Sequence, residues 1–244
     1  MDTEKKSINN YIVAAVLIIA LFCVQLLFSR LGGVISSKFD YSSFDPDGVF
    51  ALVSVHHIVQ MLLALAVISV IKIFMKDADF MLRPRKDSKG IRYTLIFCLV
   101  LIIYYLIVYS VGAYRGSINT YSYELNASNV AGSLAFQLLL SGPSEEILFR
   151  SLPITVLMFV LDPESRKDRI TAVIAAAVLF GLGHINFFAL TFSLFQVCYA
   201  TVLGLAYGFT FIRSRSIIYP MLMHSLSNVI SVGGCYLFMI FFSK

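Results

Sequence analysis

The chain has 244 residues, of which 59% are hydrophobic and only 14% charged, and its formal net charge is +5. A soluble domain carries about 25% charged residues, so this composition excludes an ordinary soluble protein and predicts a polytopic membrane protein. The positive charge does not indicate a nucleic acid partner, because short cytoplasmic loops collect lysine and arginine. We expect a single integral membrane domain over residues 1–244, with the lipid bilayer as its first partner.

Three apolar segments in the first half of the chain are long enough to cross a membrane: Tyr11–Ser29, Gly48–Ile71 and Tyr93–Tyr114. The connection Lys72–Arg92 is the most basic in the chain. The positive-inside rule therefore places this connection, and the N-terminus with it, in the cytoplasm. Two adjacent histidines, His56 and His57, lie near the outer end of the second segment, so we expect them at the water interface and not in a functional site.

The next apolar segment, Asn129–Leu161, is longer than a simple span and contains Pro143 and Pro153. At about 1.5 Å per residue it would be about 50 Å long as one helix, against a hydrocarbon core of about 30 Å. We therefore expect a helix that is strongly tilted or broken. Gly142-Pro143 is the expected place for a break, because proline interrupts the helical hydrogen bonds.

The remainder of the chain predicts three more crossings. The stretch Ile170–Ile212 contains no Asp, Glu, Lys or Arg and allows two spans, with a turn near Gly183–Asn186, and Ser216–Ser243 forms the last span. The total is seven, or eight if Asn129–Leu161 crosses twice. With seven spans, the loops at 72–92, 162–169 and 213–215 would all face the cytoplasm. The predicted fold is thus all-α, a polytopic transmembrane bundle of seven to eight helices.

Three charged side chains, Glu145, Glu146 and Arg150, interrupt the otherwise uncharged segment Asn129–Leu161. A charge at the bilayer centre costs at least about 2.5–3.5 kcal/mol, so these residues predict a functional site. Glu146 and Arg150 are four residues apart and can pair on one helical face. Glu145 points about 100° away from Glu146 and lacks a local counter-ion, which suits a general base. The alternative is a buried ionic network that only fixes helix packing.

Two histidines lie in later apolar segments. His184 is one helical turn after Phe180, and His224 shares a helical face with Asn228. Imidazole can act as a base, a proton shuttle, a metal ligand or a hydrogen-bond donor, and an interhelical hydrogen bond is the simplest alternative for each. Measured from the expected inner ends, Glu145, His184 and His224 lie about 24, 21 and 16 Å along their helices, so they can meet near one depth.

Taken together, three motifs resemble those of the CPBP family, which includes the CAAX proteases and the bacteriocin-processing or bacteriocin-immunity (Abi) proteins: Glu145-Glu146-x-x-x-Arg150, Phe180-x-x-x-His184 and His224-x-x-x-Asn228. The resemblance covers roughly Ser141–Ser231, within a motif-bearing core of about residues 129–243. It implies an intramembrane endopeptidase that cuts a peptide bond with water.

The resemblance also implies roles for single residues. Glu145 and His184 would activate the water, and His224 and Asn228 would stabilise the oxyanion of the tetrahedral intermediate. Glu146 and Arg150 match the remaining motif positions, for which we expect the supporting role described above.

A metal-free site is the favoured interpretation. Zinc is the alternative, held by Glu145, His184 and His224 with an open position for water. The chain has no H-E-x-x-H motif, which sets it apart from zinc proteases that carry that signature.

The expected substrate is a lipidated protein or a membrane-associated peptide, so the reaction would be CAAX-type processing, bacteriocin or signal-peptide maturation, or self-immunity. A bacterial cell membrane is the expected location. The other function classes are a non-catalytic immunity or scaffold protein and a proton-coupled transporter. The chain shows no inverted repeat, which argues against the transporter.

Overall fold

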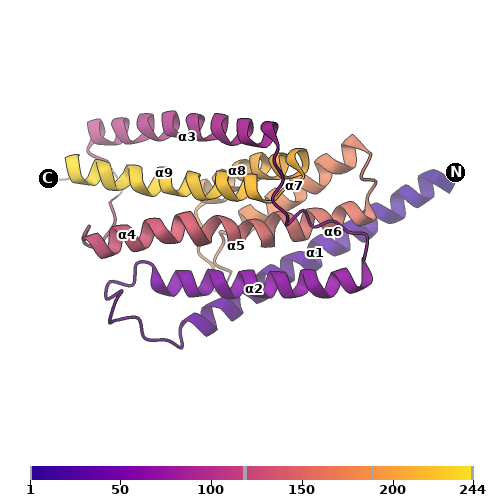
Figure 1. Ribbon diagram of the computed structural model, residues 1–244, viewed down its shortest axis with the longest axis horizontal. Helices are drawn as coiled ribbons and strands as arrows, with labels where there is room; N and C mark the ends of the chain where they lie inside the picture. Colours follow the sequence, from indigo (N-terminus) through magenta and orange to yellow (C-terminus); the bar gives the residue numbers. More distant parts are fainter. Residues whose placement is uncertain (1, 118–119, 188, 243–244) are drawn as a thin grey trace.

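The computed structural model describes residues 2–117, 120–187 and 189–242. These residues form a bundle of helices that run roughly along one axis (Figure 1), so the all-α prediction is confirmed. Within the described ranges, extended pairing is limited to an isolated bridge between Asn186 and Thr191. The predicted segments and domain also include Met1 and residues 118–119, 188 and 243–244, which lie outside the described residues.

Among the described residues, five helices are long and apolar enough to cross a membrane: α1 (Asp2–Ser36, apolar from Ile8), α2 (Ala51–Phe74), α3 (Ser88–Arg115), α8 (Leu194–Ser214) and α9 (Ile218–Phe242). Each coincides with a predicted span. Large apolar side chains on their outer faces are exposed, such as Ile19 and Leu95, as lipid-facing positions are in a membrane protein. The predicted total of seven to eight spans is not confirmed by these five.

The segment with the paired glutamates is one continuous helical rod, built from α4 (Ala127–Phe136), η1 (Gln137–Ser141), α5 (Gly142–Glu146), η2 (Ile147–Ser151) and α6 (Leu152–Val160). The predicted break at Gly142-Pro143 is therefore wrong. A π-helical turn ends two residues before each proline, Pro143 and Pro153. Because a proline ring collides with the carbonyl four residues earlier, the wider spacing of a π turn makes room for it without ending the helix.

The predicted turn near Gly183–Asn186 is present, between α7 (Arg166–Leu182) and α8. With 17 residues, α7 is about 25 Å long and ends in the middle of the bundle (Figure 1). The described residues of the connection to α8 are partly or fully exposed, such as Leu190 and Phe192, and its Phe187 packs edge-on against Phe22 of α1 at 5.3 Å between ring centroids.

The basic connections gather at one end of the bundle, as the charge bias predicts. The N-terminus and the α2–α3, α6–α7 and α8–α9 connections lie at this end, and the C-terminus lies at the other (Figure 1). Hydrogen bonds join the connections: Ser216 Oγ donates to the Arg83 carbonyl at 3.1 Å, and Tyr219 Oη donates to the Arg85 carbonyl at 2.7 Å.

At the opposite end, Asp45 fixes the start of α2. Its carboxylate accepts hydrogen bonds from the backbone N–H groups of Val49, Phe50 and Ala51 at 2.8, 2.9 and 2.6 Å. Burial by itself would raise the pKa of the Asp45 carboxyl, but the three donated N–H groups hold this pKa below its usual value. Asp45 therefore satisfies backbone donors that the first turn of a helix leaves free.

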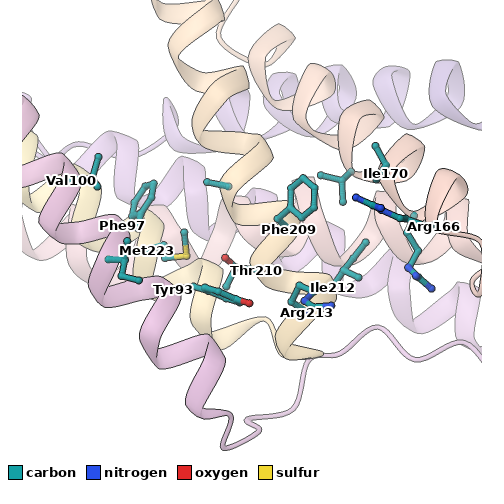
Figure 2. A pocket seen from close by; sticks show the side chains of 14 residues that line it. Tyr93, Phe97, Val100, Arg166, Ile170, Phe209, Thr210, Ile212, Arg213 and Met223 are labelled. Carbon is teal, nitrogen blue, oxygen red and sulfur yellow. The ribbon is translucent and has the colours of Figure 1, made fainter.

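A cavity of about 760 Å³ lies between α3, α7, α8 and α9 near the basic end (Figure 2). Its wall is mostly apolar, with Arg166, Arg169 and Arg213 among the lining residues. None of the predicted site residues lines it, so its size does not mark the site that the motifs predict.

Candidate active site

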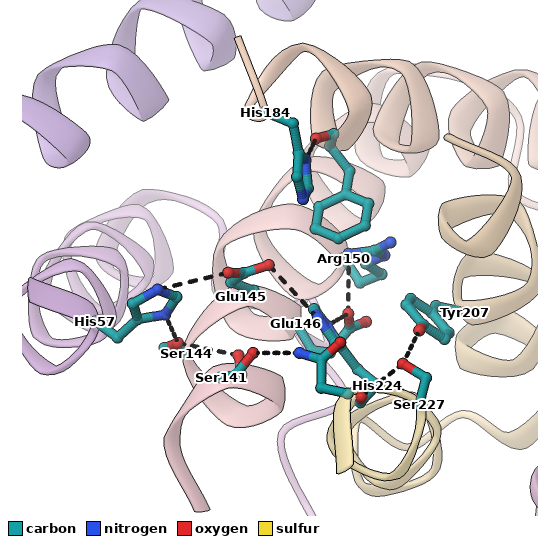
Figure 3. Close-up of polar contacts among 12 residues, drawn as sticks. His57, Ser141, Ser144, Glu145, Glu146, Arg150, His184, Tyr207, His224 and Ser227 are labelled. Carbon is teal, nitrogen blue, oxygen red and sulfur yellow. Dashed lines mark hydrogen bonds and ion pairs between the residues drawn. The ribbon is translucent and has the colours of Figure 1, made fainter. Parts of the chain in front are cut away.

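The Glu145 carboxylate lies between two imidazole rings contributed by α2 and α9 (Figure 3). Its Oε1 is 3.7 Å from Nε2 of His57, and its Oε2 is 3.6 Å from Nε2 of His224. These distances fit charge interactions and are too long for direct hydrogen bonds. The neighbouring sequence offers Glu145 no partner, but the fold supplies two from distant helices.

Glu146 and Arg150 form the pair that their spacing predicts. The guanidinium Nη1 lies 2.9 Å from Oε1 of Glu146, and both side chains are 0% exposed. The contact is not aligned as a directed hydrogen bond. Instead, the guanidinium lies over the rings of Phe180 and Tyr207, at 4.1 and 5.0 Å from their centroids, so aromatic faces also stabilise its charge.

His224 joins the two glutamates. Its Nδ1 lies 2.8 Å from Oε1 of Glu146, and its Nε2 faces Glu145. As a carboxylate paired with Arg150, Glu146 can only accept, so Nδ1 carries the hydrogen of this bond. Any proton exchanged between His224 and Glu145 must therefore use Nε2. Tyr207 stacks on the imidazole at 5.1 Å and holds the plane of the ring.

A close approach of α5 and α9 brings these residues together. Asn228 Nδ2 donates to Ser141 Oγ at 2.8 Å, one helical turn beyond His224 on α9. A Cβ atom at Gly142 would lie 2.4 Å from Ser225 Oγ and 2.6 Å from the Met221 carbonyl oxygen. Only glycine fits this position without displacing α9, so Gly142 sets the distance between the glutamates and His224.

His184, two residues beyond the end of α7, donates from Nδ1 to the Phe180 carbonyl at 2.9 Å. This bond leaves Nε2 as an acceptor, and in Figure 3 the ring points from α7 towards the glutamates. No hydrogen bond or ion pair joins His184 to Glu145 in the part of the chain that the structure describes, yet both residues line the same two cavities.

His57 is a residue of the site that the sequence did not reveal, and its expected place at the water interface is wrong. The residue is 9% exposed, its Nδ1 is hydrogen-bonded to Ser144 Oγ at 2.8 Å, and its ring packs edge-on against Phe136. A signal was available in the helical period: His57 shares the buried face of α2 with Gln60, Ala64 and Ile68, whereas the adjacent His56 does not.

Two cavities meet at the site. One, of about 410 Å³, lies beside α1, α2 and the α7–α8 connection, and the other, of about 240 Å³, lies among α2, the α4–α5 region, α7, α8 and α9. His57, Glu145 and His184 line both. A substrate could therefore approach Glu145 from either side.

The donor set does not form a preassembled metal centre. In the described ranges, no group of three or more His, Cys, Asp or Glu side chains is arranged to hold a metal ion. His184 and His224 each use Nδ1 in a hydrogen bond, a pattern that zinc ligands also show. The geometry nevertheless does not place Glu145, His184 and His224 around one common point, so it does not fit zinc as it stands.

Residues 127–230 match the family model described as Type II CAAX prenyl endopeptidase Rce1-like. No curated protein and no solved structure matches the chain. All six predicted site residues lie within the matched region, whereas α1, α2 and α3 lie outside it. Residues 127–230 are thus similar to the Rce1-like domain of the CPBP/CAAX protease family, and the five apolar helices among the described residues indicate an integral membrane protein.

Proposed function

We propose that the protein is an intramembrane endopeptidase that hydrolyses a peptide bond with a water activated by Glu145. The observation that carries the proposal is the Glu145 carboxylate, held between two imidazoles in the interior of the bundle and open to two cavities. The match of this region to a protease family supports the same reaction.

In this mechanism, Glu145 takes a proton from the water while the water oxygen bonds to the carbonyl carbon. The free Nε2 of His184 accepts the second hydrogen bond of the water and orients it. The carbonyl electrons move onto oxygen, and when the C=O bond forms again the C–N bond breaks. The leaving amine takes the proton that Glu145 received, so the carboxylate is regenerated.

The oxyanion is stabilised by donors on α9. Nδ1 of His224 already donates to Glu146, so Nε2 can donate to the oxyanion only in the imidazolium form. The carboxylates of Glu145 and Glu146 stabilise the charge of this form. The Asn228 amide adds a second donor. Glu146, fixed by Arg150, orients His224 as a carboxylate orients the histidine of a Ser-His-Asp triad. This is the supporting role that we assign to the Glu146–Arg150 pair.

We propose a metal-free reaction, because the carboxylate and imidazoles supply the base and the donors themselves. The zinc alternative is tested by measuring metal content and chelator sensitivity of the purified protein. Stoichiometric zinc that is lost together with activity would overturn the metal-free mechanism.

For the membrane topology we propose seven spans: the five apolar helices, the rod 127–160 and α7. For the substrate we propose the C-terminal region of a lipidated protein, because the matching family is described as CAAX prenyl endopeptidases, or a membrane-associated peptide in a bacterial membrane. Peptide maturation and self-immunity are the roles that such cleavage would serve.

The test is cleavage of an internally quenched peptide that carries a prenylated cysteine in a CAAX sequence, by protein reconstituted in lipid vesicles. Glu145→Ala, His184→Ala and His224→Ala should each lower kcat by at least about 100-fold, the lower limit for general acid–base groups and for oxyanion donors alike. Each variant is first compared with the unmodified protein in membrane abundance and gel-filtration profile. Cleavage that survives all three substitutions refutes the proposed reaction and favours a scaffold or a transporter.

A further inference from the structure

The cavity beside α1 and α2 has polar features that the hydrolysis at Glu145 does not use. It is about 410 Å³ in volume and reaches Glu145, His57 and His184 at one side. Its other polar lining residues come from α1, α2 and the α7–α8 connection: Gln25, Ser29, Arg30, His56, Gln60 and Asn186. Most of them lie outside the region that matches the protease family.

Gln25 is the unusual member of this lining. The residue is only 5% exposed, and neither its amide oxygen nor its amide nitrogen has a hydrogen-bond partner in the ranges that the structure describes. A buried amide is normally paired, because burying its donors and acceptors unpaired is unfavourable. The side chain therefore holds one acceptor and two donors for which the described part of the protein provides no match.

A peptide backbone is the complement of such a side chain. Each residue of a peptide carries one N–H donor and one C=O acceptor, and both can pair with a single carboxamide. Phe22, Phe149 and Phe187 line the same cavity, so an apolar peptide stretch also finds apolar contacts there. A free water molecule could use the amide of Gln25 but gains nothing from these rings.

We propose that this cavity is a substrate subsite, which holds an apolar peptide stretch on one side of the scissile bond through hydrogen bonds from the Gln25 carboxamide to the peptide backbone. The inference rests on the proposed peptidase function. The 240 Å³ cavity would receive the other side of the peptide. Because both cavities are lined by His57, Glu145 and His184, a peptide that runs from one to the other presents its bond to the Glu145 carboxylate.

The central test is Gln25→Leu, measured with the quenched CAAX peptide. The substitution removes the hydrogen bonds to the substrate, so KM should rise roughly threefold to tenfold while kcat stays within about twofold. It also removes an unpaired buried amide, so the thermal unfolding midpoint should be unchanged or higher. A residue that only supports the fold would show the opposite pattern, a lower midpoint with an unchanged KM.

Leu27→Met is the control, because Leu27 lies on the same helix but is 53% exposed on its outer face. This variant should match the unmodified protein in KM and kcat. A Gln25→Leu protein with an unchanged KM overturns the subsite. So does a fall in kcat alone, because that result would make the cavity a reservoir for the attacking water.

Binding separates the subsite from the peptidase function. The same peptide is titrated into Glu145→Gln protein, with and without Gln25→Leu, and followed by fluorescence anisotropy. Weaker binding on loss of Gln25 supports the subsite even if the unmodified protein cuts nothing, in which case only the peptidase function fails. Binding that is absent, or indifferent to Gln25, overturns the subsite even where cleavage is observed.

Discussion

Replacing Arg150 by methionine tests whether the buried pair with Glu146 holds the fold or takes part in the reaction. Both side chains are 0% exposed, and the atoms of the pair are 2.9 Å apart. Removing one partner of a buried ion pair is destabilising by about 3–5 kcal/mol, because the other charge stays buried without compensation. His224 still donates to Glu146 at 2.8 Å, so the lower end of this range, about 3 kcal/mol, is the expected loss.

The assay is unfolding in mixed detergent micelles, followed by far-ultraviolet circular dichroism, together with the amount of protein in the membrane. A loss of about 3 kcal/mol is a large part of a typical total stability of 5–15 kcal/mol, so the yield of Arg150→Met should also fall. The matched control is the double variant Glu146→Gln/Arg150→Met, which has neither charge. It should recover most of the lost stability, since a buried ion pair is often replaceable by uncharged residues.

Two results would refute this reasoning. If Arg150→Met unfolds like the unmodified protein but cleaves the peptide slowly, Arg150 has a direct catalytic role. If the double variant is as unstable as the single one, the loss comes from packing against Phe180 and Tyr207 and not from the stranded carboxylate.

Three further predictions concern His57, Gly142 and Asp45. The amide nitrogen of His57→Gln replaces Nε2, which faces Glu145, and the amide nitrogen of His57→Asn replaces Nδ1, which meets Ser144. We expect a higher kcat for His57→Gln than for His57→Asn. A higher kcat for His57→Asn would mean that His57 only holds α2 to α5. In Gly142→Ala the added methyl group pushes α9 away from α5. Stability measured by unfolding in detergent should fall by about 1–3 kcal/mol, and kcat should fall as well. Unchanged values would show that the position of α9 does not depend on this contact. The pKa of Asp45 is lower in the folded protein than the unfolded value of about 3.9, so its stabilisation is complete above that pH and is lost as the pH falls through it towards the folded pKa. The free energy of unfolding of Asp45→Asn should therefore be lower by about 1 kcal/mol at neutral pH. Between neutral pH and about pH 3, this variant should lose less stability than the unmodified protein. Parallel curves of stability against pH would show that the stabilisation does not come from the Asp45 charge.

Local geometry explains why part of the site was predictable from the sequence. The Glu146–Arg150 pair could be predicted because the two residues lie one helical turn apart. The apolar helices could be predicted because they depend only on local composition. The turn after α7 followed from an uncharged stretch too long for one span. Each of these features is decided within a few residues or within one helix.

The features that the sequence did not reveal depend on contacts between distant segments. His57 and Ser144 are separated by 87 positions, and no local rule brings α2 to α5. The rod through Gly142-Pro143 shows the same limit, because proline favours a break locally and the packing of α9 against α5 favours continuity. Gln25 is likewise only recognisable as unpaired once its neighbours are in place.

The two π turns of the rod set the rotation of its three α-helical parts about the helix axis independently of one another. A π turn is equivalent to one residue inserted into an α-helix, so it rotates everything beyond it by about 100° about the axis. Here η1 fixes the direction of Glu145 and Glu146 relative to α4, and η2 fixes the face of α6 relative to both. Deleting a single residue from Gln137–Ser141 would restore a regular helix and turn the glutamates away from the histidines, although no residue of the site itself had changed.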